Sequence, residues 1–261
     1  MKYSLSSRQT AEYLTKTDEI RVEYRDNEMI YDLVEKYPNK KINLVLPLED
    51  VDINWKRIRE LSILSRGNLI IGVINSAQAM EAKKLDIVFY HRAFLHSFQE
   101  LNDLRQAGAE YVYLGAPLFF QLDKVQRYYP TLKVRVLANV ALPEGSMSYN
   151  NGVCGTWIRP EDVATYEPYI DTIEFADELS AERALYRIYA EQHKWGSTLN
   201  SIIKDIQHDA LNRMIPPTLA EVRISCGQRC MENGHCHLCQ RTFDLANAEL
   251  LNNYLASQEQ S

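Results

Sequence analysis

Along the first two thirds of the chain, short runs of consecutive apolar residues alternate with segments in which apolar residues recur at helical spacing. Eight compact runs of apolar or β-branched residues are typical of strands that are buried on both faces. These runs are Lys2–Leu5, Ile20–Tyr24, Ile42–Leu46, Leu69–Ile74, Ile87–Tyr90, Tyr111–Leu114, Val134–Asn139 and Thr172–Phe175.

Segments with the spacing of amphipathic helices lie between most of these runs. They are Arg8–Leu14, Met29–Lys36, Trp55–Leu64, Ala77–Lys84, Phe98–Ala107 and Leu122–Tyr128. Strands that alternate with helices predict an α/β fold, and eight of them predict a (β/α)8 TIM-like barrel. The units average about 22 residues, against roughly 30 in a typical barrel. A compact or irregular barrel and an open parallel sheet are therefore both kept as alternatives.

The pattern changes after residue 178. Helices are predicted at Ala181–Gln192, with Ser180 as the N-cap, and then at Leu199–Met214 and Asp244–Leu255. We therefore divide the chain into a (β/α) barrel over residues 1–178 and a helical, cysteine-rich extension over residues 179–261.

Composition narrows the class of protein. Hydrophobic residues make up 46% of the chain and charged residues 25%, as in ordinary soluble globular proteins. The net charge of −6 argues against a broad nucleic-acid-binding surface. No apolar run approaches the roughly 18 residues of a membrane span, and the N-terminal sequence lacks the apolar core of a signal peptide. We expect a cytoplasmic protein, in a reducing compartment where clustered cysteines bind metals more often than they form disulfides.

Four of the five cysteines lie within fourteen residues near the C-terminus. They are Cys226, Cys230, Cys236 and Cys239, with the spacing C-x3-C-x5-C-x2-C. Gly227 and Gly234 occupy the first two gaps, where the chain must bend to direct several sulfur atoms at one point. Thiolates prefer zinc or iron to hard cations, so the cluster predicts a metal site. The spacing does not choose between the two metals.

Histidines and arginines near the four cysteines each have more than one possible role. His235 and His237 can each replace a cysteine in a zinc site, or can be solvated loop residues. Arg223, Arg229 and Arg241 can offset the negative charge of four thiolates around a metal, or can be ordinary surface arginines. Unliganded thiols and disulfides are the remaining alternatives.

Barrel enzymes carry their chemistry at the carboxyl ends of the strands. The polar residues at the predicted ends are Arg25, Asp26, Asn75, His91, Arg92, Gly115–Pro117, Asn139, Glu174 and Asp177. His91 and Arg92 directly follow a buried run, and a histidine there can act as an acid or base or bind an anion. We take His91, Arg92 and Glu174 as candidate catalytic residues. Polar groups also end strands in many proteins without any such role.

The longest predicted loop, residues 141–155, leaves the seventh strand at the end where barrel loops act as lids or contact substrates. It carries Cys154, which can be a nucleophile, a redox partner, a fifth sulfur near the metal, or a small residue in a tight turn. The chain contains no P-loop, no G-x-G-x-x-G and no G-x-S-x-G. Nucleoside-triphosphate hydrolysis and serine hydrolase chemistry therefore have no support.

Two segments resemble the collagenase-like peptidase superfamily. Residues 106–115, QAGAEYVYLG, resemble its Ala-Gly-Ala turn before a V-Y-L-G strand, and residues 227–231, GQRCM, resemble its cysteine-rich segment. The resemblance implies a barrel fold. Relatives that hydroxylate RNA bases or quinone precursors hold a 4Fe-4S cluster on four cysteines, so it also implies a cluster on Cys226, Cys230, Cys236 and Cys239. The first segment lies near the N-terminus in that family and mid-chain here, so no active-site residue is transferred.

Two functional hypotheses follow. In the first, the chain is a cytoplasmic iron-sulfur barrel enzyme that carries out modification or hydroxylation chemistry on RNA or a small aromatic substrate. In the second, it is a non-catalytic binding or scaffold protein that joins a partner protein in a macromolecular complex, and zinc stabilises its extension. A zinc-dependent hydrolase is weaker, because four sulfur ligands leave no open coordination position.

Overall fold

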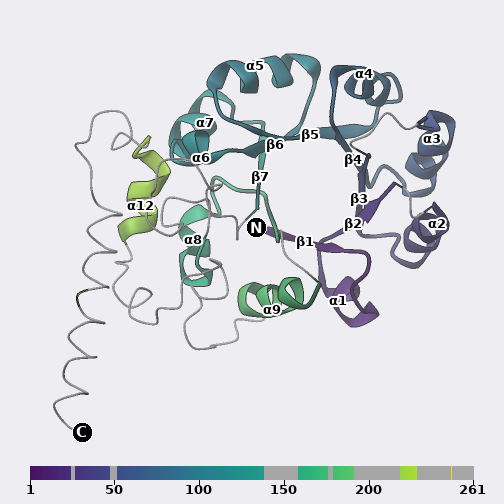
Figure 1. Ribbon diagram of the computed structural model, residues 1–261, viewed down its shortest axis with the longest axis horizontal. Coiled ribbons are helices and arrows are strands. Elements are labelled where there is room, and N and C mark those ends of the chain that lie inside the picture. The colour runs from purple at the N-terminus through teal and green to yellow at the C-terminus, as the bar shows by residue number, and fades with distance from the viewer. Residues whose placement is uncertain are drawn as a thin grey trace, which may run out of the picture.

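The computed structural model describes residues 1–24, 27–47, 52–137, 158–175, 179–190, 218–227 and 248. Within these ranges, parallel strands form one closed barrel in which each strand pairs with the next and β8 pairs with β1 (Figure 1). The strands are β1 (Lys2–Ser6), β2 (Glu19–Glu23), β3 (Lys41–Val45), β4 (Leu69–Val73), β5 (Val88–Leu95), β6 (Tyr111–Leu114), β7 (Lys133–Leu137) and β8 (Thr172–Glu174). The predicted (β/α)8 barrel is confirmed.

Helices surround the barrel and follow the strands in sequence (Figure 1). They are α1 (Ala11–Lys16), α2 (Asn27–Lys36), α3 (Trp55–Leu64), α4 (Ser76–Lys84), α5 (Phe98–Ala107), α6 (Ala116–Phe119), α7 (Leu122–Tyr128), the 3-10 helix η2 (Pro160–Asp162), α8 (Val163–Tyr166), α9 (Leu179–Ala190) and α12 (Thr218–Ser225). Local signals fix several boundaries. Ser97 and Glu100 form a capping box at the start of α5, and Gly108 ends that helix with φ of 97°.

Most elements differ from their predicted bounds by one or two residues, and α1 and β5 differ by more. Helix α1 begins at Ala11 rather than Arg8, because residues 7–9 form a turn in which the Gln9 N–H donates to the Ser6 carbonyl at 3.1 Å. Strand β5 continues past Tyr90 to Leu95. Ser180 lies inside α9, which starts at Leu179, and is not its N-cap. The helices predicted at 199–214 and 244–255 lie outside the described residues, apart from residue 248.

Outward-facing strand residues pack against the helices in two large apolar clusters. One cluster contains Leu5, Val134 and Ile173, and the other contains Ile20 and Leu44. Every second residue of the same strands therefore faces the barrel interior.

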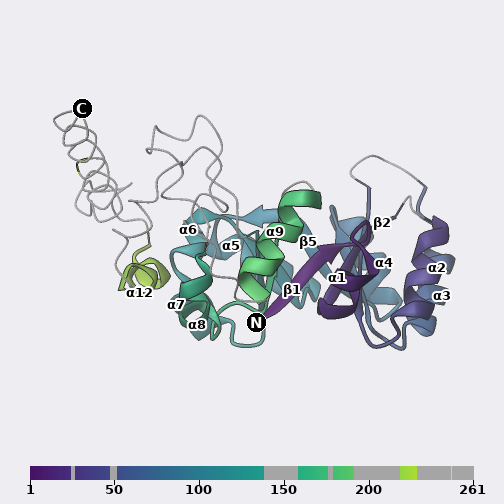
Figure 2. The same ribbon diagram turned by 90° about the horizontal axis from the view of Figure 1, so that it is seen from below.

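The two C-terminal helices that the structure describes pack on the barrel. Tyr186 and Tyr189 of α9 lie against the Tyr3 ring of β1, with centroid separations of 6.1 and 6.4 Å. Arg223 of α12 lies over the rings of Phe119 and Phe120, with its Cζ 5.3 and 5.2 Å from the centroids. Figure 2 shows α12 beside α7 and α8. A separate extension that begins at residue 179 stays a prediction.

Among the described residues, no helix combines the length and the apolar character that crossing a bilayer requires.

Candidate active site

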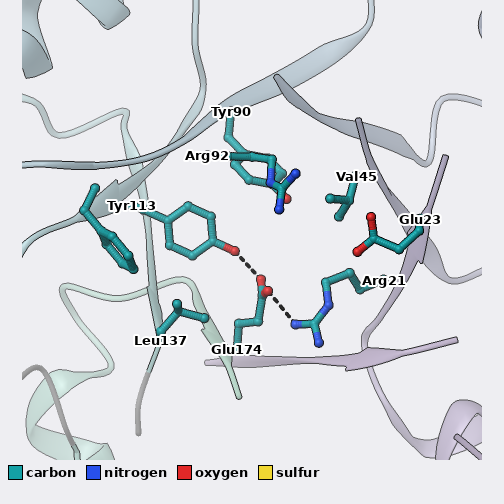
Figure 3. A pocket seen from close by; sticks show the side chains of 9 residues that line it. Arg21, Glu23, Val45, Tyr90, Arg92, Tyr113, Leu137 and Glu174 are labelled. Atoms are coloured by element: carbon teal, nitrogen blue, oxygen red, sulfur yellow. Dashed lines mark hydrogen bonds and ion pairs between the residues drawn. The ribbon is translucent and has the colours of Figure 1, made fainter. Parts of the chain in front are cut away.

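A pocket of about 380 Å³ opens at the carboxyl ends of the strands (Figure 3). Six strands supply its lining: Arg21 and Glu23 of β2, Val45 of β3, Tyr90, Arg92 and Phe94 of β5, Tyr113 of β6, Leu137 of β7 and Glu174 of β8. This is the end of the barrel at which TIM-barrel enzymes bind their substrates, and the volume suits a small ligand.

Alternation along β2 explains how charged side chains reach the interior. In its sequence, EIRVE, Ile20 and Val22 join the outer apolar cluster. Glu19, Arg21 and Glu23 therefore point inward, one above the other. Most TIM barrels fill this space with branched apolar side chains. This barrel instead holds paired charges below and around its pocket.

A fully buried ion pair lies beneath the pocket. The two Nη atoms of Arg135, on β7, donate to the two carboxylate oxygens of Glu19 at 2.9 and 2.5 Å. Ser4 and Asn43 also donate to Glu19 Oε1, each at 2.8 Å. Burial lowers the pKa of Arg135, but the charge of Glu19 and its hydrogen bonds raise it further, so the guanidinium keeps its proton.

Glu174 is the carboxylate that joins the interior to the pocket. It accepts hydrogen bonds from Arg21 and from the Tyr113 hydroxyl (Figure 3). Arg135 Nη2 also lies 3.3 Å from its Oε2. Burial alone would raise its pKa. The charges of Arg21 and Arg135 outweigh that effect and hold the pKa below its ordinary value of 4.5. Glu174 is therefore an ionised anchor at neutral pH.

The tyrosines of the interior act as neutral hydrogen-bond donors. Burial and the charge of Glu174 raise the pKa of Tyr113 well above its ordinary value. The same two causes raise the pKa of Tyr90, whose hydroxyl donates to Asn43 Oδ1 at 2.9 Å. Their rings meet edge to face with centroids 5.3 Å apart, and Phe94 packs on Tyr113 at 5.9 Å. These rings form an apolar wall beside the charged groups.

A carboxylate from α9 completes the network. Glu182 is fully buried, and its side chain accepts from the Ser6 N–H and from Gln9 Nε2, both at 2.8 Å. Its Oε1 also lies 3.4 Å from Arg21 Nη2. Arg21 therefore lies between two carboxylates, one from the barrel and one from the helix.

Arg92 and Glu23 also line the pocket, but they are not part of this network. Arg92 Nη1 donates to the Leu46 carbonyl at 2.7 Å. Gly72 of β4 leaves room for this arrangement, since a Cβ there would lie 2.7 Å from Tyr90 Oη and 3.1 Å from Arg92 Cγ. Within the part of the chain that the structure describes, neither Arg92 nor Glu23 forms an ion pair.

The structure brings two of the three predicted catalytic residues, Arg92 and Glu174, to the pocket. His91 is not among the lining residues. It lies within β5 between two inward-facing neighbours, and its Nδ1 accepts from the Ala93 N–H at 3.2 Å. Asn75 caps α4, accepting from the Gln78 N–H. Arg25, Asp26, Asn139, Asp177 and Cys154 lie outside the described residues.

The cysteine cluster is described only at its first member. Cys226 directly follows α12 and is partly exposed, while the Gly227 N–H donates to the Phe120 carbonyl at 2.6 Å. The other three cysteines, His235, His237, Arg229 and Arg241 fall outside the described ranges. In those ranges no group of three or more metal-binding side chains occurs. The four-cysteine metal site therefore stays a prediction.

Acid is expected to weaken the fold through Glu174. Its folded-state pKa is lowered, so the stability that its ionised form contributes is present above pH 4.5 and is lost as the pH falls below that value. The free energy of urea unfolding, measured from about pH 7 to about pH 3, should fall less steeply for Glu174→Gln than for the wild type. Equal slopes for the two proteins would contradict this assignment.

Comparisons with known proteins do not identify a family. No family model matches the chain, and no curated protein does. Solved structures similar to it include one described as native KDPGal, with a TM-score of 0.46 and 10% identity over 74% of this chain and 93% of that one. A 3-hexulose-6-phosphate synthase from Salmonella typhimurium has a TM-score of 0.43 and 14% identity over 74% and 100%. A U32 peptidase has a TM-score of 0.43 and 10% identity over 67% and 92%. TM-scores and identities this low carry no argument about activity, and membership of the collagenase-like peptidase superfamily stays a hypothesis.

Proposed function

We propose that this chain is an enzyme whose active site is the pocket at the carboxyl ends of the barrel strands, and that it carries out modification or hydroxylation chemistry on RNA or a small aromatic substrate. One observation carries the proposal: charged, hydrogen-bonding and aromatic side chains from four strands converge on a single pocket, which apolar side chains from two more strands complete. Burying so many charges does not stabilise a fold better than apolar packing does, so a functional reason for them is expected.

The lining residues suit distinct tasks. Phe94, Tyr113 and Leu137 offer an apolar surface to a flat substrate. Glu23 is exposed and outside the buried ion-pair network, so it can accept a proton from a bound hydroxyl or amine. The Tyr113 hydroxyl and Arg21 are both hydrogen-bonded to Glu174, which fixes their positions beside the substrate.

We further propose that Cys226, Cys230, Cys236 and Cys239 hold a 4Fe-4S cluster. Such a cluster supplies one-electron transfer. Helix α12 supports this placement, because it holds Cys226 against the segment that follows β6 on the barrel. Metal analysis tests two alternatives: that Cys154 supplies a fifth sulfur near the metal, and that the four cysteines hold a structural zinc instead of a cluster.

The active-site assignment predicts a loss of product in a Glu23→Gln variant. Digested RNA nucleosides and small aromatic metabolites are compared by mass spectrometry between cells that express the wild type and cells that express the variant. We expect the wild type to produce a modified compound and Glu23→Gln to reduce it by about 10²-fold or more. Glu12→Gln, on the exposed face of α1, is the control and should retain full product. Full product from Glu23→Gln would contradict the assignment.

Metal analysis of protein purified without oxygen tests the cofactor. We expect iron, acid-labile sulfide and broad visible absorption, and we expect Cys226→Ser to lose most of all three. Cys154→Ser should keep the iron, the acid-labile sulfide and the visible absorption if Cys154 is not a ligand. About one zinc per chain without iron would contradict the iron-sulfur proposal and favour the scaffold hypothesis.

A further inference from the structure

The charged side chains at the pocket fall into two sets. Glu19, Arg135, Glu174, Arg21 and Glu182 contact one another and satisfy most of their charge within the protein. Arg92 is different, since its only hydrogen bond among the described residues goes to a neutral carbonyl, that of Leu46. A guanidinium has five N–H donors, so Arg92 keeps donors available for a ligand.

The barrel holds Arg92 in a position suited to binding. Its Cγ lies over Gly72, where a side chain would collide with it, and its Nη1 is fixed by the Leu46 carbonyl. Figure 3 shows the guanidinium extending from β5 into the pocket, with Glu23 on β2 across from it. A guanidinium fixed in this way loses little entropy on binding, and its planar donors match the two oxygens of a carboxylate.

The balance of charge favours one class of anion. Glu23 and Glu174 line the same pocket, and Arg21 is already shared between Glu174 and Glu182. Outside the paired network, Arg92 contributes one positive charge to the lining and Glu23 contributes one negative charge. A singly charged carboxylate bound to Arg92 meets less repulsion from Glu23 and Glu174 than a doubly charged phosphate does. The apolar wall of Phe94, Tyr113 and Leu137 accommodates the rest of the ligand.

We propose that the substrate is a small carboxylic acid whose carboxylate binds Arg92 while its apolar body lies against the aromatic wall. This inference rests on the proposed function, because it places the substrate in the same pocket. It also selects a small molecule over RNA, which offers phosphates but no carboxylate.

Isothermal titration calorimetry with three probes tests the proposal. Benzoate carries one carboxylate, benzamide is its neutral analogue, and phenyl phosphate is doubly charged at neutral pH. We expect the wild type to bind benzoate about tenfold more tightly than either of the other two probes. Arg92→Gln should lose that preference, and Arg92→Lys should keep part of it. Arg59→Gln, on the exposed surface of α3, is the matched control and should bind as the wild type does.

The outcomes separate this inference from the proposed function. Equal binding of benzoate and benzamide, a preference for phenyl phosphate, or a preference for benzoate that survives in Arg92→Gln would each overturn the carboxylate assignment. Failure of all three probes to bind would overturn it as well. None of these results alters the comparison of products from wild-type and Glu23→Gln cells, which decides separately whether the pocket is an active site.

Discussion

Replacing Arg135 by methionine is expected to destabilise the protein by about 3–5 kcal/mol. Arg135 is fully buried and binds both oxygens of Glu19, whose exposed fraction is 2%. Removing the guanidinium leaves the Glu19 carboxylate charged and unpaired in the barrel interior, and it also takes a positive charge away from Glu174. The free energy of urea unfolding, followed by circular dichroism at neutral pH, measures the loss.

Two further variants show whether the loss comes from the unpaired charge. Glu19→Gln combined with Arg135→Met removes both charges and should recover a large part of the stability. Lys133→Met, also on β7, breaks the Lys133–Glu110 pair, whose side chains are 43% and 51% exposed. Its cost should stay below about 1 kcal/mol. A cost for Arg135→Met no greater than that for Lys133→Met would contradict the role assigned to the buried pair.

The fold was predictable because its signals are local. Helices α3, α5 and α7 have the predicted bounds, and in two of them Asn54 and Ser97 provide caps that a sequence reader can recognise. The spacing of apolar residues and the residues that begin and end a helix define such elements without any knowledge of the tertiary structure. The count of eight strand–helix units then led to a closed barrel, since β1 and β8 had to be neighbours for the sheet to close.

Much of the site was missed because the strands were treated as buried on both faces. The β2 sequence EIRVE and the β7 sequence KVRVL alternate strictly between charged and apolar residues up to their last positions. That alternation was the available signal that Glu19, Arg21 and Arg135 point inward. The pairing itself was not predictable, because Arg135 and Glu19 lie 116 residues apart and meet only when the barrel closes.

The predicted strand ends were partly informative. Glu174 is the last residue of β8 and Arg92 lies in the carboxyl-terminal half of β5, so both reach the pocket. His91 was paired with Arg92 on the expectation that β5 ends at Tyr90. The strand continues, and Tyr90, Arg92 and Phe94 all line the pocket, so the His91 side chain points in the opposite direction to Arg92. A catalytic role for His91 stays an untested prediction.

Glu182 links the first C-terminal helix to the pocket, and Glu182→Ala is expected to cost about 2–4 kcal/mol. The substitution leaves the part-buried Ser6 N–H and the buried Gln9 Nε2 without their acceptor, and it leaves Arg21 with Glu174 alone. Hydrogen exchange should therefore become faster in α9 and at the end of β1. Glu12→Ala, which removes an exposed pair with Lys16, should change stability by no more than about 0.5 kcal/mol.

The pH dependence of the same residue distinguishes a link through charge from simple packing. Burial raises the pKa of Glu182 despite the hydrogen bond from Gln9 and the charge of Arg21. A raised folded-state pKa means that Glu182 stabilises the fold most below its ordinary value of 4.5, and that this contribution is lost as the pH rises through the folded-state pKa. Glu174 has the opposite dependence, because its pKa is lowered. In the wild type, the contribution of Glu182 to stability therefore decreases as the pH rises. Glu182→Gln should abolish this decrease, whereas Glu174→Gln should retain it. If both variants change the pH profile in the same direction, Glu182 does not act on the pocket through its charge.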